Sequence, residues 1–171
     1  MKYYYFTLLI LVLGLSACSP NTNFELYEGK SLRIAVIGEP PEVKEEQVRF
    51  DAVSFDEITS EGIGSYDAVL ITEENLNKAA ESQYAEVYLN STIPFFFIST
   101  KSHIPFTLKD TVYDNTWNWT AGDYYAVGVL TSQEDDALKS WGYGLYNDKK
   151  TDEHIEEVYS RIFKTIDELN L

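Results

Sequence analysis

The chain has 171 residues and carries 28 acidic and 13 basic side chains, which gives a formal net charge of −15. No basic stripe in the sequence could release counterions from a phosphate backbone, so nucleic acid is not an expected partner. The single cysteine excludes both a disulfide within the chain and a cluster of thiolate metal ligands.

An apolar run begins the sequence. Lys2 precedes an almost unbroken apolar stretch over residues 3–13. This stretch is shorter than the roughly 20 apolar residues that a transmembrane helix needs, and it matches the about 7–15 residues of a signal-peptide core. The small residues Ser16 and Ala17 follow it, as a cleavage site requires. We therefore predict a signal peptide over residues 1–17.

The residues Leu15-Ser16-Ala17-Cys18 resemble the lipobox of bacterial lipoproteins. The resemblance covers only the leader. It implies that a diacylglyceryl group, with fatty acids such as palmitate, is attached to the Cys18 sulfur, and that the leader is removed before this residue. The alternatives are an ordinary secretion signal with an incidental cysteine and a buried free thiol. An ordinary signal would leave an unpaired thiol on a secreted protein, which lipidation explains.

We expect residues 18–30 to form the lipidated cysteine and a flexible polar tether. Removal of residues 1–17 takes away one basic residue, Lys2, and no acidic residue, so 28 acidic and 12 basic side chains leave a charge of −16. A diacyl anchor that buries on the order of 25–30 methylenes contributes roughly 20 kcal/mol, whereas an anionic surface repels each nearby charge by about 1 kcal/mol. The anchor therefore holds the protein on the extracytoplasmic face of the cell membrane.

Five segments have the composition of β-strands: residues 31–38, 48–55, 67–72, 93–98 and 124–130. Residues 93–98 are apolar on both faces, which is typical of a central parallel strand. Pro40 and Pro41 end the first strand, because proline cannot donate to a ladder. Only nine residues separate the first two strands, fewer than a parallel crossover needs. Either residues 42–47 form a single helical turn, or the second strand is short and lies at an edge.

Helical periodicity occurs between and after these strands. Apolar residues recur at spacings of three and four over residues 73–89, with Thr72 as a cap, and again over residues 155–169 behind Asp152 and Glu153. A shorter helix is expected over residues 133–140. Strands alternating with helices predict an α/β fold over residues 31–171. The expected architecture is a single three-layer sandwich with a mostly parallel five-stranded sheet, flavodoxin-like or Rossmann-like in outline.

Polar residues follow the ends of the predicted strands, where ligands of such sheets gather. They are Gly38, Glu39, Thr72, Glu73, Ser99, Thr100, Lys101, His103, Thr131 and Ser132. One interpretation is a small-molecule or phosphate site in which Lys101 and the hydroxyls donate. His103 could serve as a base if a hydroxyl came within hydrogen-bond reach. The other is that the hydroxyls cap helices and the polar residues solvate loops. The sequence contains no nucleotide-binding, hydrolase or metal-binding motif, so no cofactor or metal is predicted.

Aromatic residues gather in two later segments, residues 113–119 and 141–146. Trp117 and Trp119 could form a stacking surface for a sugar or a peptide, and Trp141 is expected to pack over one end of the sheet. The segments 66–71, 93–98 and 141–146 make the chain similar to small α/β lipoproteins of Gram-positive bacilli. That resemblance implies exposure outside the cytoplasmic membrane and no known reaction.

Three functions are consistent with these features. The first is a membrane-anchored binding or interaction module that uses Ser99, Thr100, Lys101, His103, Trp117 and Trp119 to hold a protein or small-molecule ligand. The second is a hydrolase-like enzyme of the cell envelope, which requires Ser99, Lys101 and His103 to converge. The third is an accessory or immunity-type lipoprotein that contacts another protein through an apolar surface patch. We favour the first, and the third overlaps it physically.

Overall fold

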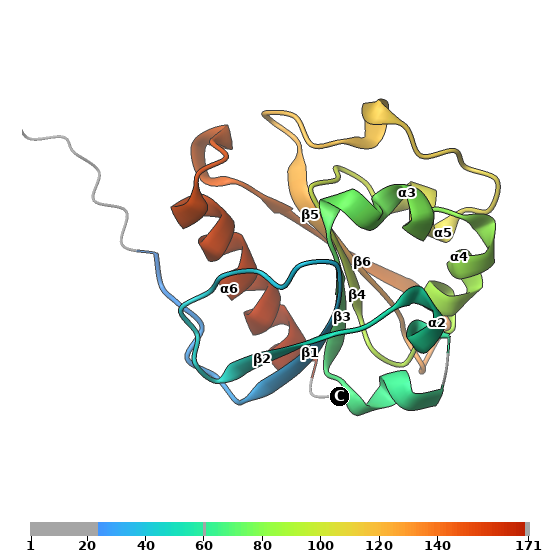
Figure 1. Ribbon diagram of the computed structural model, residues 1–171, viewed down its shortest axis with the longest axis horizontal. Helices are drawn as coiled ribbons and strands as arrows, with labels where there is room; N and C mark the ends of the chain where they lie inside the picture. The colour runs from blue at the N-terminus through green and yellow to red at the C-terminus, as the bar shows by residue number, and fades with distance from the viewer. Residues whose placement is uncertain (1–23, 60, 170–171) are drawn as a thin grey trace, which may run out of the picture.

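A computed structural model of the protein describes residues 24–59 and 61–169. The chain folds around a six-stranded mixed sheet in the order β2-β1-β3-β4-β5-β6 (Figure 1). The strands are β1 (Leu32–Ile37), β2 (Val48–Ala52), β3 (Ala68–Ile71), β4 (Phe95–Ile98), β5 (Tyr124–Thr131) and β6 (Leu138–Gly144). The α/β class is therefore confirmed, with one strand more than the five predicted.

The sheet is parallel only in its first part. The pairs β1–β2, β1–β3 and β3–β4 are parallel, whereas β4–β5 and β5–β6 are antiparallel. The prediction of a mostly parallel sheet is thus correct only in outline. Strand β5 reverses because residues 99–123 contain only short helical turns, and they return the chain at the edge of the sheet where β4 ends. Strand β2 is short and lies at an edge, as one of the two alternatives predicted.

Five α-helices occur in the described part of the chain: α2 (Phe55–Ile58), α3 (Leu76–Ala79), α4 (Ser82–Leu89), α5 (Ile104–Thr107) and α6 (Asp152–Glu168). Short 3-10 turns precede or link them: η2 (Glu61–Ser65), η3 (Glu73–Asn75), η4 (Asn115–Trp117) and η5 (Tyr146–Asp148). Over residues 24–59 and 61–169, none of the helices combines the length and the apolar character that crossing a bilayer requires.

Helix α6 alone covers one face of the sheet. Its residues Val158, Ile162 and Phe163 are fully buried against Ile34 of β1 and Phe96 of β4. This is the stripe that the sequence predicts for the C-terminal helix. Thr151 caps the helix, because its hydroxyl accepts a hydrogen bond from the His154 N–H at 3.3 Å.

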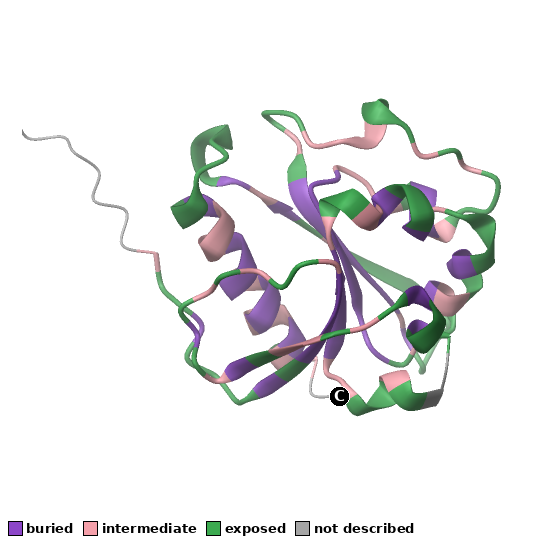
Figure 2. Cartoon of the chain, in the orientation of Figure 1, coloured by how far each residue is buried: buried purple, intermediate pink, exposed green. Residues whose placement is uncertain are grey.

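Helices α2 to α5 cover the opposite face, so the molecule has the three layers that were predicted (Figures 1 and 2). Phe95 and Phe97 point to this side, where Phe97 stacks on Phe106 of α5 with ring centroids 3.8 Å apart. Each phenyl ring buried in this way contributes about 1.5–3 kcal/mol relative to exposure. The predicted single helix over 73–89 is interrupted, because Glu81 is extended and the Tyr88 hydroxyl donates to the Ala79 carbonyl.

The predicted helix over residues 133–140 is wrong. Residues 133–136 form a turn with Asp136 at a φ of 54°, and the Ser132 N–H donates to the Ala137 carbonyl at 2.9 Å to begin a hairpin. Strand β6 follows this turn. Trp141 and Tyr143 are two residues apart and both point to the α6 face, as the side chains on one side of a strand do. Gly128 on β5 makes this packing possible, since a Cβ there would lie 2.5 Å from the Phe96 ring.

Residues 24–30, which were expected to belong to a flexible tether, pack on the domain. Tyr27 is 3% exposed, and its ring lies edge-on to Phe163 with centroids 6.1 Å apart. Its backbone N–H donates to Glu45 Oε1 at 3.3 Å, and its carbonyl accepts from Gln47 Nε2 at 2.7 Å. Residues 24–30 are therefore held on the domain; the predicted signal peptide, Cys18 and residues 19–23 of the predicted tether lie outside the described residues.

Candidate functional site

The predicted polar rim lies where β1, β3 and β4 end, at the upper edge of the sheet in Figure 1. We call the residues at this edge the strand-end rim: Gly38, Glu39, Thr72, Glu73, Ser99, Thr100, Lys101 and His103. Thr131 and Ser132 do not belong to it. They were predicted on the assumption that β5 is parallel, and the antiparallel direction of β5 places them at the opposite edge.

Ser99 and Thr100 are buried structural residues, with 3% and 0% of their surfaces exposed. Ser99 has a φ of 69°, its N–H donates to the Tyr125 carbonyl at 2.6 Å, and its own carbonyl accepts from the Trp119 N–H at 3.1 Å. The Thr100 hydroxyl donates to the Trp117 carbonyl at 2.9 Å. These bonds attach the segment 115–119 to the end of β4.

Lys101 and His103 have separate surroundings. Lys101 Nζ lies 3.9 Å from a carboxylate oxygen of Asp123, and its backbone N–H donates to the Trp117 carbonyl. His103 is the N-cap residue of α5, and burial lowers the pKa of its imidazole. In the described part of the chain no hydrogen bond joins the side chains of Ser99, Lys101 and His103. The convergence of these three groups that a hydrolase-like site would require is therefore not seen among the described hydrogen bonds.

Two residues that sequence reasoning missed at the rim are Lys150 and Tyr125. Lys150 Nζ contacts Glu73 at 3.1 Å, donates to Ser99 Oγ at 3.5 Å and lies 5.6 Å from the centre of the Tyr125 ring. Burial, with the negative charge of Glu73, raises the pKa of Tyr125 to about 12. Lys150 comes from the segment before α6, and no strand-end pattern in the sequence could have indicated it.

The rim is closed between β1 and β3 by side-chain contacts. Gly38 has a φ of 120°, and a Cβ at this position would lie 1.8 Å from Thr72 Oγ1, so only glycine fits. The Thr72 hydroxyl donates to the Ile37 carbonyl and to the Glu74 carboxylate instead of capping the following turn. Burial would raise the pKa of Glu74, but hydrogen bonds from Thr72 and from the Glu74 and Glu39 backbone N–H groups outweigh it and lower the pKa.

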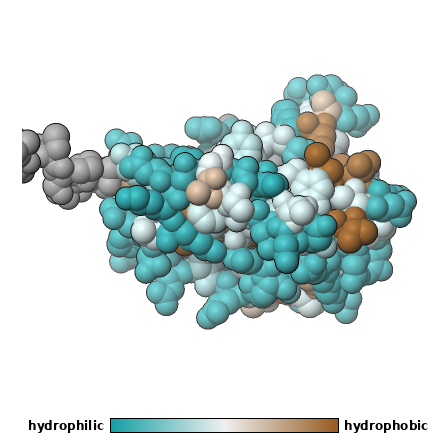
Figure 3. Space-filling view, turned by 90° about the horizontal axis from the view of Figure 1, so that it is seen from above, coloured by the Kyte–Doolittle hydropathy of each residue, from teal (hydrophilic) through white to brown (hydrophobic). Residues whose placement is uncertain are grey.

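All three tryptophans are half-buried. Trp117 Nε1 donates to the Val112 carbonyl at 3.2 Å, and Trp119 lies edge-on to Tyr125 with ring centroids 6.0 Å apart. Trp141 packs beside Phe96 at 6.4 Å, as predicted for this residue. Figure 3 views this edge from above and shows apolar surface at one end of the molecule. In the segment that follows β4, the exposed apolar residues are Ile104, Leu108 and Val112, whose exposed fractions are 41%, 61% and 77%.

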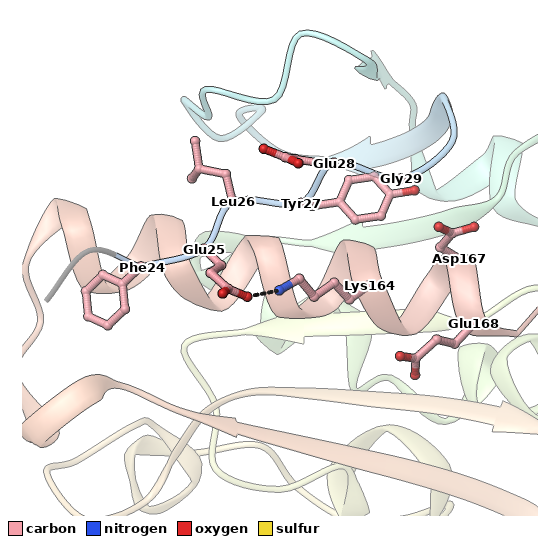
Figure 4. Close-up of a pocket in the computed structure, with 9 residues that line it drawn as sticks. All are labelled: Phe24, Glu25, Leu26, Tyr27, Glu28, Gly29, Lys164, Asp167 and Glu168. Carbon is pink, nitrogen blue, oxygen red and sulfur yellow. Dashed lines mark ion pairs between the residues drawn. The ribbon is translucent and has the colours of Figure 1, made fainter.

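Open grooves flank helix α6. The first, of about 750 Å³, lies between the segment Phe24–Gly29 and the second half of α6, where Glu25 approaches Lys164 to 3.9 Å (Figure 4). The second, of about 660 Å³, lies between the loop after β1 and the first half of α6. We call it the acidic groove; its lining residues are Pro41, Glu42, Val43, Lys44, Asp152, Glu153, Ile155, Glu156 and Tyr159.

Within residues 24–59 and 61–169, no cluster of three or more histidine, cysteine, aspartate or glutamate side chains is arranged to hold a metal ion. Comparison of the chain with protein-family models, with curated proteins and with solved structures gave no match. A function must therefore be argued from the residues of this chain alone.

Proposed function

We propose that the protein is a lipoprotein anchored through Cys18 to the extracytoplasmic face of the cell membrane, and that its α/β domain is a binding module for a protein or small-molecule ligand. One observation supports a binding role more than any other. The rim residues Thr72, Ser99 and Thr100 use their polar groups in hydrogen bonds within the protein, whereas the grooves beside α6 are open and lined by exposed polar side chains.

The path of the N-terminal segment supports a placement close to the membrane. Phe24 packs edge-on against Tyr146 and His154, with ring centroids 5.4 and 5.6 Å apart, near the beginning of α6. Five residues separate Cys18 from Phe24, and an extended chain over these six Cα-to-Cα steps spans at most about 20 Å. A lipid on Cys18 would keep the grooves beside α6 close to the bilayer surface, within reach of membrane proteins and of ligands gathered there.

The order β2-β1-β3-β4 of the parallel strands is also that of a doubly wound, flavodoxin-like sheet. We infer that the domain is a variant of this outline in which the last two strands form an antiparallel hairpin. In the doubly wound outline ligands bind at the carboxyl ends of the strands, near the point where the strand order reverses. Here the loop after β1, at that point, forms one wall of the acidic groove.

Intact mass spectrometry of protein extracted from membranes tests the anchor. The expected result is a chain that begins at Cys18 and carries a diacylglyceryl group. The variant Cys18→Ala should accumulate as an uncut precursor without lipid, because the leader is removed only after the sulfur is modified in proteins with this motif. A chain with an unmodified sulfur, released into the medium, would contradict the proposal.

Crosslinking in intact cells tests the binding role. We expect the full-length chain to capture one defined partner or ligand, and a variant with altered groove residues to lose it. Capture that persists when the groove is altered but disappears with Ile104→Ser and Leu108→Ser would move the binding surface to the apolar segment after β4. That outcome would favour the accessory or immunity-type lipoprotein.

An envelope hydrolase is the second candidate, favoured by the left-handed backbone of Ser99 and the 3.5 Å contact of its hydroxyl with Lys150. In the structure Lys150 Nζ contacts Glu73 and donates to Ser99 Oγ, so this contact supplies no acceptor for the proton of the Ser99 hydroxyl. Hydrolysis of a chromogenic ester by the purified chain, abolished by Ser99→Ala, would support this candidate. Equal rates for both chains would eliminate it.

A further inference from the structure

The acidic groove joins two parts of the chain that are far apart in sequence. One wall is the loop Pro41–Lys44, and the other is formed by the first two turns of α6. Lys44 Nζ reaches across the groove to Glu156 Oε2 at 2.6 Å, a contact between residues 112 positions apart. The groove is therefore a product of the tertiary fold and is held in place by the same packing that holds α6 on the sheet.

The floor of the groove is apolar. Val43 and Ile155 are half-buried and pack against the core on the α6 side, and Tyr159 beneath them is 5% exposed. Above this floor the side chains are charged, with four carboxylates and a single ammonium group. An apolar floor under a negative rim suits a ligand that has both an aliphatic stem and a cationic end.

The helix dipole explains only some of the carboxylates. Asp152 and Glu153 lie in the first turn of α6, where acidic residues are favoured without any ligand. Glu42 belongs to the loop and Glu156 to the second turn, so neither gains from the dipole in this way. The Glu156 side chain is only 14% exposed. It forms an ion pair with Lys44, whose side chain is 68% exposed at the groove surface.

The groove lies in a region of excess negative charge. The hydrogen bond to Glu156 and the charges of Glu156, Glu153 and Glu45 raise the pKa of Lys44. Glu45, next in the chain, is 4% exposed. Its Oε1 accepts hydrogen bonds from Tyr27 and Ser160, whereas its Oε2 has no hydrogen-bond partner in the described structure.

We propose that the acidic groove binds a cationic segment of a polypeptide, with lysine or arginine stems along Val43 and Ile155 and their charged ends among Glu42, Glu153 and Glu156. This deepens the proposed function by naming the ligand class of the binding module. Lys44 already shows the mode of contact, since its own stem and ammonium group occupy part of the groove. A peptide is favoured over a bare metal ion because the carboxylates are spread along the groove and do not converge on one point.

Fluorescence anisotropy of a labelled decalysine peptide tests the proposal, with full-length protein in a neutral detergent at about 150 mM salt, where charges farther apart than roughly 8 Å are largely screened. The groove variant carries Glu42→Gln, Glu153→Gln and Glu156→Gln. The matched control carries Glu81→Gln, Asp110→Asn and Asp136→Asn, which lie away from the groove. Both variants lose three negative charges, so they have the same net charge.

We expect the groove variant to bind decalysine about tenfold more weakly than the wild type, and the control to bind it nearly as well as the wild type. Ile155→Ala, which removes floor contacts and no charge, should weaken binding by about fourfold. Circular dichroism confirms that each variant is folded before binding is compared. Equal weakening by the two triple variants would show attraction to the whole acidic surface and would overturn the proposal.

Two further outcomes would also overturn it: no binding of decalysine by the wild type, or loss of binding with Ile104→Ser and Leu108→Ser in place of the groove residues. The peptide assay uses purified protein and does not depend on the lipid. A failure of peptide binding is therefore distinguishable from a failure of the anchor, which the mass measurement reports.

Discussion

The strand-end rim and the acidic groove are both rich in polar residues, but these residues have opposite roles. At the rim, Ser99 and Thr100 are buried and bond to the backbone of neighbouring segments. At the groove, Glu42 and Lys44 are exposed, and Lys44 pairs with Glu156 at the surface of the protein. Polar residues at strand ends are therefore not sufficient to identify a binding site. The burial of the polar side chains, complete at Ser99 and Thr100 and slight at Glu42 and Lys44, separates the two regions.

The largest expected effect is under the rim. Phe106 is fully buried, stacked on Phe97 and 5.7 Å from Tyr113. Phe106→Ala should lower the free energy of unfolding by about 3–5 kcal/mol, because it leaves a cavity beneath the segment that carries the rim. Ile155→Ala on the floor of the groove is the comparison, with an expected loss of about 1–2 kcal/mol. Urea denaturation measures both, and equal losses would remove the distinction between the two regions.

The next effect concerns the Thr100 hydroxyl. Thr100→Val keeps the shape of the side chain but removes the donor to the Trp117 carbonyl. We expect a loss of about 1–3 kcal/mol, the cost of leaving a buried polar group unpaired. Thermal unfolding gives the stability, and tryptophan fluorescence reports the loosening of residues 115–119. Unchanged stability would mean that the rim hydroxyl is available to a ligand after all.

A smaller effect is expected from Glu74, whose pKa is lowered in the folded protein by hydrogen bonds that outweigh its burial. Because the folded pKa lies below the unfolded one, this carboxylate stabilises the fold above about pH 4 and loses that contribution as the pH falls through the folded pKa. Glu74→Gln should thus be less stable than the wild type at pH 7, by under about 1 kcal/mol because Glu74 is exposed. Denaturation at a series of pH values should show the gap closing in acid; a constant gap would refute this assignment.

The smallest effect on stability is expected at the groove. Glu42→Gln changes an exposed loop residue and should alter the free energy of unfolding by less than about 0.5 kcal/mol. The same variant should weaken binding of decalysine, so its stability and its binding respond differently. A large loss of stability would indicate that Glu42 has a structural role like that of the rim residues.

Much of the fold could be predicted from local patterns. The five predicted strands and the C-terminal helix are present. They could be predicted because the apolar pattern of a strand, and the stripe of Val158, Ile162 and Phe163 on the helix, depend only on which side of that one element is buried. Strand β6 was missed because Gly142 and Gly144 weaken its strand pattern, and its pairing with β5 is visible only in three dimensions. The break at Glu81 likewise depends on the hydrogen bond from Tyr88 to Ala79, which the helical period does not reveal.

The candidate site was less predictable. Strand ends indicated where the rim lies, but not that Ser99 bonds inward or that Lys150 reaches it from the segment before α6. The acidic groove could not be predicted, because the residues of its two walls, such as Lys44 and Glu156, are 112 positions apart. No periodicity of a single element reports such a contact.

The sequence by itself determined the apolar stripe that α6 buries and the strongly negative charge, and the lipid on Cys18 stays a prediction. Only the tertiary structure decided the direction of β5, the docking of Tyr27 against α6 and the pairing of loop 41–44 with that helix. The physical reason is one of range. Whether a residue is buried follows from a pattern of residues close to it in sequence. The shape of a groove depends on which segments, distant in sequence, the packed core brings into contact.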